Sequence, residues 1–140
     1  MSECYRLLLV PSFRPSVSVR LEASASAATA VTKAWVGDPF LGLGELSQDT
    51  RRQLAGEELD AFRALVKESR FWRLPSETDR AGLDGSDWVL EGRNARSHHV
   101  VVRWSPQRTG DDAAFRELCE FMLALEAGGS SDRPASNDGL

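Results

Sequence analysis

The chain has 140 residues, of which 41% are hydrophobic and 27% are charged, and its formal net charge is −4. A chain of this length buries roughly two thirds of the surface that its unfolded form exposes, so its core needs neither disulfides nor a metal ion. The acidic balance argues against a general nucleic-acid binder, because such proteins neutralise phosphates with clustered lysine and arginine. Composition therefore predicts one soluble globular domain and names no reaction.

The early apolar run Leu7–Val10 ends at Pro11. It is too short for the core of a signal peptide and far too short for a membrane span, so we expect a cytoplasmic protein with no membrane partner. The two cysteines, Cys4 and Cys119, form no disulfide framework. One bridge between them is conceivable, but two unpaired thiols fit the reducing compartment that we expect.

The first part of the chain, from Tyr5 to about Leu46, has the texture of β-strands. An apolar run fills 5–10, apolar and polar residues alternate over 16–21, and β-branched and aromatic residues follow over 30–36. These patterns predict antiparallel strands. The glycine-rich stretch 37–44 lacks the Gly-Lys-Ser/Thr ending of a phosphate-binding loop, so we interpret it as a hairpin connection.

Two helices and a second hairpin are predicted in the rest of the chain. Apolar residues recur at helical spacing over 57–72, which predicts the first helix. Two short apolar runs, 88–91 and 98–104, predict strands that are joined by a tight loop. The last helix is expected to begin near Asp111 or Asp112, which would cap it, and to end at Gly128.

The predicted order is therefore ββββαββα. It corresponds to an α+β fold with a mainly antiparallel sheet of about six strands and two helices on one face. Residues 1–128 are expected to form this single domain. The segment 129–140 has almost no apolar residues and is expected to be a disordered C-terminal tail.

The register of the second hairpin decides which side chains share a face. If its loop has an odd number of residues, Asp87 lies opposite Arg103 and Glu91 lies opposite His99, while the other face is wholly apolar. An even loop would instead mix Arg103 and His99 with Trp88. We therefore predict the odd register.

The polar face of this hairpin has two interpretations. It is either a solvated sheet surface with cross-strand pairs, each contributing about 0.2–1 kcal/mol, or a ligand site. In such a site Glu91 raises the proton affinity of His99, and the Arg103 guanidinium binds an anion with two hydrogen bonds. Asp84 lies at the entrance of the site, although an Asp-Gly turn also explains this residue. Because His98 and His99 are adjacent on a strand, they face opposite sides. We expect no metal site and no cofactor.

Two segments of the chain resemble a family of small uncharacterised bacterial proteins. They are Gly82–Gly92, which reads GLDGSDWVLEG, and His99–Pro106, which contains HVV followed by RWSP. The similarity covers about residues 5–127. This chain has His98 where tyrosine is usual and Val102 where aspartate is common. The resemblance implies no assigned activity, and Val102 argues against a mechanism that needs an acid at that position.

The function that we expect first is a non-catalytic domain that binds another protein. The chain is acidic and compact, and no catalytic set can be recognised in it. An immunity-type inhibitor that masks a basic toxin fits these features. The contact surface is either the loop 37–44 or the polar face of the second hairpin. The expected surface residues are Asp84, Asp87, Glu91, His99 and Arg103.

The alternative is a small hydrolase or lyase. In this interpretation His99 is the general base, Glu91 orients it, and Arg103 stabilises an anion. The shape around His99 distinguishes the two functions, because a deep pocket favours an enzyme and a flat exposed face favours a binding domain.

Overall fold

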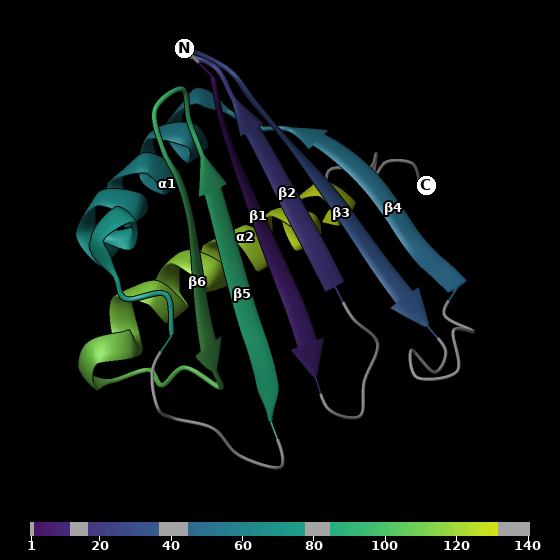
Figure 1. The fold of residues 1–140 in the computed structure, drawn as a ribbon. Helices are drawn as coiled ribbons and strands as arrows, with labels where there is room; N and C mark the ends of the chain where they lie inside the picture. The colour runs from purple at the N-terminus through teal and green to yellow at the C-terminus, as the bar shows by residue number, and fades with distance from the viewer. Residues whose placement is uncertain (1, 12–16, 37–44, 78–84, 132–140) are drawn as a thin grey trace.

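The computed structural model of the protein describes residues 2–11, 17–36, 45–77 and 85–131. It confirms the predicted α+β fold, with the element order β-β-β-β-α-β-β-α. All six strands form one sheet in the order β4-β3-β2-β1-β5-β6, and every neighbouring pair is antiparallel (Figure 1). The strands are β1 (Glu3–Pro11), β2 (Val17–Ala23), β3 (Ala28–Val36), β4 (Glu45–Gln53), β5 (Ser86–Arg93) and β6 (His98–Trp104); the helices are α1 (Gly56–Ser69) and α2 (Ala113–Ser131), with the short 3-10 helices η2 (Phe71–Arg73) and η3 (Gly110–Asp112).

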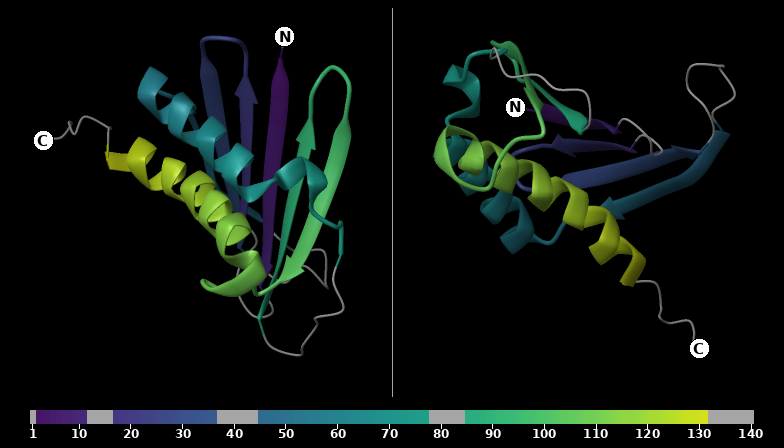
Figure 2. Two further views of the ribbon diagram at one scale, coloured as in Figure 1. Left: turned by 90° about the vertical axis from the view of Figure 1, so that its left-hand side faces the viewer. Right: turned by 90° about the horizontal axis from the view of Figure 1, so that it is seen from below.

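Both helices lie on the same side of the sheet (Figure 2). Side chains alternate between the two faces of a strand, so every second residue meets the helices. Leu7, Leu90 and Val101 lie side by side on three neighbouring strands, and each has no exposed surface. They belong to one core cluster with Phe62 from α1 and Phe115 from α2. The single core therefore lies between the sheet and the helix pair.

Helix α1 begins without a capping side chain, because Ala55 has no oxygen to accept a hydrogen bond. The Glu58 carboxylate compensates in part, since it accepts the Ala55 backbone N–H at 2.8 Å and also pairs with Arg52 at 2.7 Å. The helix ends at Ser69, and the next residue, Arg70, has a φ of 56° in the left-handed region. A 3-10 turn follows, so the α-helix stops three residues before the predicted end at Trp72.

Helix α2 begins at Ala113, directly after η3, which agrees with the predicted start near Asp111 or Asp112. The predicted end at Gly128 is wrong, because the helix continues to Ser131. Glycine lowers helix propensity by about 1 kcal/mol but leaves the backbone hydrogen bonds intact, so it does not stop a helix by itself. The expected tail therefore begins inside α2, and its remainder, 132–140, lies outside the described residues.

The loop between β5 and β6 spans residues 94–97, an even number. Asn94 shapes this loop: its side-chain Oδ1 accepts the backbone N–H groups of Arg96 and Ser97, both at 2.8 Å. The Asn94 N–H donates to the carbonyl of Ser97 at 2.9 Å. This turn, in which an asparagine side chain replaces backbone acceptors, fixes the register of the hairpin.

The predicted odd register is therefore wrong. Gly92, not Glu91, lies opposite His99, and Glu91 lies opposite Val100. Trp88 lies opposite Arg103, so the two candidate site residues of β6 are on the helix side of the sheet.

The segment that leaves η2 runs along the outer side of β6. The Val102 N–H donates to the carbonyl of Ser76 at 2.7 Å. The His99 ring contacts the carbonyl of Leu74 with its Nε2 at 2.8 Å. No helix of the described part of the chain is long and apolar enough to cross a membrane.

Candidate binding surface

Arg103, a predicted site residue, is a buried side chain with only 4% of its surface exposed. Its Nη1 donates to the Val102 carbonyl at 2.9 Å, and the Ser76 carbonyl lies at 3.4 Å. Its Nε lies 3.4 Å from Asp112 Oδ1, which makes an ion pair without a well-aligned hydrogen bond. The guanidinium also lies over the Phe115 ring, 5.9 Å from its centroid. Arg103 therefore ties β6 to η3 and α2 within the protein.

His99 also faces the helix side. Its Nε2 must carry a hydrogen, because the Leu74 carbonyl that it contacts can only accept. Its ring packs edge-on against Phe71, with centroids 5.4 Å apart. Glu91 projects from the opposite face of the sheet. The pair of Glu91 and His99 that the catalytic interpretation requires is therefore not formed, and no observation favours that interpretation.

Glu91 forms a charged cluster on the other face with His98 and Arg6. Its Oε2 lies 2.5 Å from His98 Nε2, and its Oε1 lies 3.1 Å from Arg6 Nη2. The hydrogen bond from His98 and the positive charge of Arg6 lower the pKa of Glu91. Sequence reasoning selected the wrong histidine because it assumed the odd register. The even loop that Asn94 forms is the signal that could have identified His98.

Of the remaining residues that we expected at the contact surface, the structure describes only Asp87. Asp87 is exposed and lies opposite Trp104 rather than Arg103. Asp84 and the loop 37–44 lie outside the described residues.

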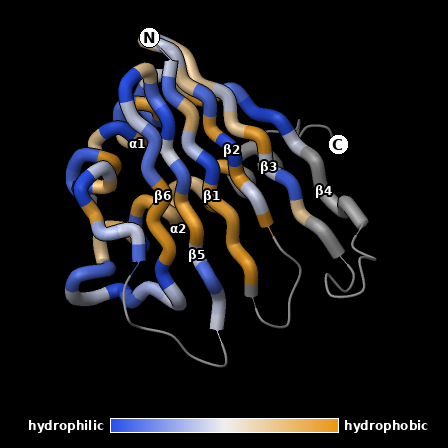
Figure 3. Tube along the Cα trace, in the orientation of Figure 1, coloured by the Kyte–Doolittle hydropathy of each residue, from blue (hydrophilic) through white to orange (hydrophobic). Residues whose placement is uncertain are grey.

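We call the face of the sheet that the helices leave uncovered the open face (Figure 1). Wherever the structure describes their exposure, the side chains of this face are half-buried or exposed, and none is buried. The open face has two halves of different character, which Figure 3 shows as blue and orange stretches of the same strands.

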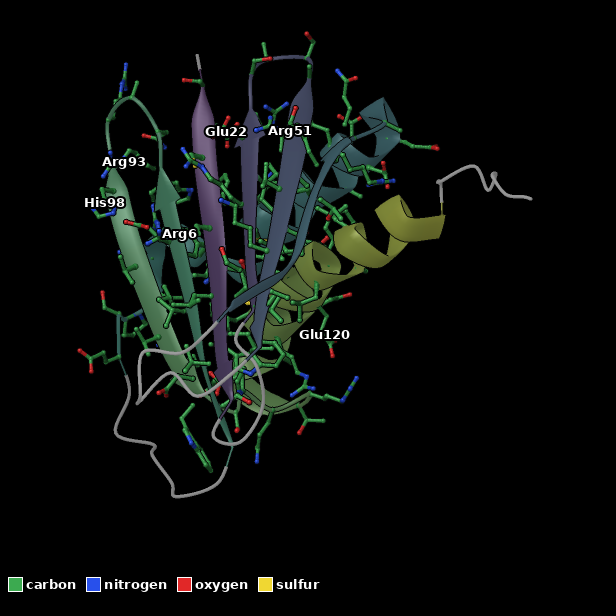
Figure 4. The ribbon with its side chains drawn as sticks, turned by 90° about the vertical axis from the view of Figure 1, so that its right-hand side faces the viewer. Arg6, Glu22, Arg51, Arg93, His98 and Glu120 are labelled. Atoms are coloured by element: carbon green, nitrogen blue, oxygen red, sulfur yellow. The ribbon has the colours of Figure 1, made fainter. Side chains whose placement is uncertain are left out.

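The arginine-rich half lies toward the Asn94–Ser97 turn (Figure 4). Four arginines on β1, β2, β4 and β5 accompany two glutamates, and both glutamates are already paired, since Glu22 contacts Arg20 at 2.9 Å. This half is therefore net positive although the whole chain carries −4. It consists of Arg6, Arg20, Glu22, Arg51, Glu91, Arg93 and His98.

The apolar half lies on β1, β5 and β6, toward their other ends. Leu8, Val89 and Val102 are direct neighbours across three strands. Val10 is 39% exposed, the largest exposure of a large hydrophobic residue in the described part of the chain. The half consists of Leu8, Val10, Val89, Val100, Val102 and Trp104, and the exposed Asp87 lies between Val10 and Trp104.

Two cavities among the described residues bear on function. One, of about 570 Å³, is a groove at the edge of the arginine-rich half, lined by Cys4, Arg20 and Arg93 among others. The other, of about 420 Å³, lies beside the end of α1 and is treated below. His99 lines neither cavity. The open face thus has a groove at the edge of its arginine-rich half, whereas His99 lies on the other side of the sheet.

No protein-family model matches the chain, and no curated protein matches it either. The resemblance of Gly82–Gly92 and His99–Pro106 to small bacterial proteins stays a prediction from those motifs.

Proposed function

We propose that this protein is a non-catalytic binding domain that recognises another protein through the open face of its sheet. The observation that supports this is the apolar half, which neither helix covers and which borders an arginine-rich half. Protein interfaces combine an apolar centre with a polar rim, and they are enriched in aromatic residues and arginine. On the open face, Trp104 is an aromatic residue of the apolar half, and the arginine-rich half contains four arginines.

The size of the open face suits such an interface. The six strands lie about 4.8 Å apart and have seven to nine residues, at roughly 3.4 Å per residue, so the sheet spans about 24 Å across and about 24–31 Å along the strands. The projected area of about 600–700 Å² is of the order of the 800 Å² that each partner contributes to a standard interface. Side chains that stand out from the sheet add further accessible area.

The charges of the open face support one kind of partner. Arg51 and Arg93 are both exposed on this face. They favour an acidic contact surface, because complementary charges steer association and disfavour partners of like charge. The expectation of a basic toxin as the partner is therefore replaced by that of a partner with an acidic contact surface.

Site-specific photocrosslinking tests this proposal in the cells that make the protein. A photoreactive amino acid at Val31 or Val100 samples the open face, and one at Glu57 or Asp60 samples the exposed side of α1. We expect one discrete crosslinked protein from the two open-face positions. Crosslinks of equal strength from the α1 positions would overturn the proposal.

A charge-reversal pair then examines the arginine-rich half. Replacing Arg51→Glu and Arg93→Glu should abolish the crosslink at Val31. The matched control reverses two charges elsewhere, Glu57→Arg and Asp60→Arg, and should leave it intact. A crosslink that survives the arginine replacements would show that these charges do not select the partner.

A further inference from the structure

The second cavity, of about 420 Å³, lies on the helix side, between β1 and the end of α1. Its volume falls in the range of small-molecule sites, roughly 300–1,000 Å³. Three aromatic residues, Tyr5, Phe71 and Trp72, belong to its lining. Apart from Glu3, it shares no lining residue with the groove on the open face.

Four cations line this cavity at intervals of four, three and three residues: Arg63, Lys67, Arg70 and Arg73. Arg63 and Lys67, four residues apart, lie along one side of α1, whereas Arg70 follows the end of that helix and Arg73 belongs to η2. Glu3 is the one acid of the lining, and Arg63 contacts its Oε2 at 3.0 Å.

Arg63 is committed to the protein itself. Besides Glu3, its Nη2 donates to the Ser24 carbonyl at 2.6 Å and its Nη1 to the Ala25 carbonyl at 3.1 Å. The charges of Arg63 and Glu3 therefore neutralise each other. Lys67, Arg70 and Arg73 remain, and each of them is exposed.

The backbone holds these three cations together. Arg70 has φ 56° and ψ 38°, a left-handed conformation that favours glycine, and its carbonyl accepts the Arg73 N–H at 2.9 Å. This turn leads directly into η2, and both Arg70 and Arg73 line the cavity. The negative end of the α1 dipole offsets part of the repulsion among three like charges, but it is equivalent to only about half a charge.

Trp72 provides a ring surface next to the cations. Its indole is half-buried and packs edge-on against Phe71 at 5.1 Å and Tyr5 at 6.1 Å, measured between ring centroids. The ring is therefore held in place by the core while part of it stays accessible.

We propose that this cavity binds a small organic phosphate that carries a planar ring, of about the size of a mononucleotide. Lys67, Arg70 and Arg73 hold the phosphate oxygens, and the planar ring rests against Trp72. Two guanidinium forks beside an ammonium group match the several oxygens of a phosphate better than the two of one carboxylate. This binding is independent of the open face and of its partner.

Isothermal titration calorimetry with ADP tests the proposal on the full chain. ADP should bind saturably, pyrophosphate more weakly and adenosine not measurably. Arg73→Gln should weaken ADP binding by about ten-fold or more, as expected for the loss of a charge-assisted hydrogen bond. Trp72→Leu should weaken the binding of ADP but not that of pyrophosphate.

Arg70→Gly separates an effect on binding from an effect on folding. Glycine adopts the left-handed conformation without the steric cost that an arginine has there, so the variant loses the cation but not stability. This variant should be more stable than the wild type and still bind ADP at least about ten-fold more weakly. The matched control, Arg51→Gln with Arg93→Gln on the open face, should bind ADP as the wild type does.

Several results would overturn the proposal. They are the absence of saturable ADP binding, equal affinity for ADP in Arg70→Gly, or equal weakening by the open-face control. Equal affinity for ADP and pyrophosphate would refute the ring contact, and equally tight binding of a polyglutamate peptide would refute the assignment to a phosphate. None of these outcomes involves a protein partner, so failure here is distinguishable from failure of the proposed function.

Discussion

Gly92 occupies the point where the aromatic cluster comes closest to the sheet, and replacing it tests the packing directly. A Cβ at this position would lie 2.6 Å from Phe71 Cε2 and 3.0 Å from Tyr5 Cε2. Both rings are almost wholly buried and pack against each other with centroids 6.0 Å apart. Neither ring can retreat without disturbing the core, so Gly92→Ala must displace buried side chains.

The expected change is a loss of stability of about 1–3 kcal/mol, which is typical of overpacking. Alanine would by itself stabilise the protein by about 0.4–1 kcal/mol, because it reduces the freedom of the unfolded chain, so the clash must exceed this gain. Urea unfolding measures the free energy directly. In thermal unfolding each kcal/mol corresponds to a shift of roughly 2–8 °C for domains of this size range.

Gly56→Ala is the matched control. Gly56 is the first residue of α1, and a Cβ built on it would meet no atom of the described residues within 4 Å beyond its chain neighbours and the backbone of its own helix. We expect this variant to be neutral or more stable by up to about 1 kcal/mol.

Adding Phe71→Leu to Gly92→Ala should recover part of the loss, with a coupling energy of about 0.5–3 kcal/mol in a double-mutant cycle. A Gly92→Ala protein as stable as the wild type, or a coupling energy of zero, would refute the packing argument.

Two further predictions concern titratable groups. Because the pKa of Glu91 is lowered in the folded protein, its contribution to stability is present above the unfolded pKa of about 4.3 and disappears as the pH falls through the folded pKa. Glu91→Gln should therefore cost about 0.2–1 kcal/mol in urea unfolding at pH 7 and nothing near pH 2, and a pH-independent cost would contradict this. Cys119 has no exposed surface, and burial raises the pKa of its thiol, whereas Cys4 is half-buried and free. Ellman's reagent should therefore titrate Cys4 alone in the native protein and both thiols in denaturant; fast reaction of Cys119 under native conditions would show that α2 opens.

The fold was predictable because periodicity decides it. Alternation over β2 and helical spacing over α1 and α2 are strong local signals, and the second hairpin has clear turn residues. The end of α1 was less predictable, since the stop depends on the left-handed conformation of Arg70, a residue that ordinarily favours a helix.

The candidate site was not predictable, because the hydrophobic pattern of β6 does not determine its register. Val100, Val101 and Val102 are consecutive, so either face of the strand can be apolar. The register is set instead by the hydrogen bonds of the Asn94 side chain in the loop. The buried Arg103 pairs with Asp112 on η3, the element that follows β6, and no periodicity in the sequence reveals this contact.

The segment that runs from Leu74 to Ser76 has a consequence for how this sheet behaves toward other chains. An edge strand offers unpaired N–H and carbonyl groups, which makes it a template for intermolecular pairing and aggregation. On β6 the Val102 N–H already donates to the Ser76 carbonyl, and the His99 ring contacts the Leu74 carbonyl, so this segment is held beside the strand. A foreign strand would have to displace this segment before it could add to β6. Residues 74–76 thus protect the edge strand β6 against pairing with a strand of another molecule.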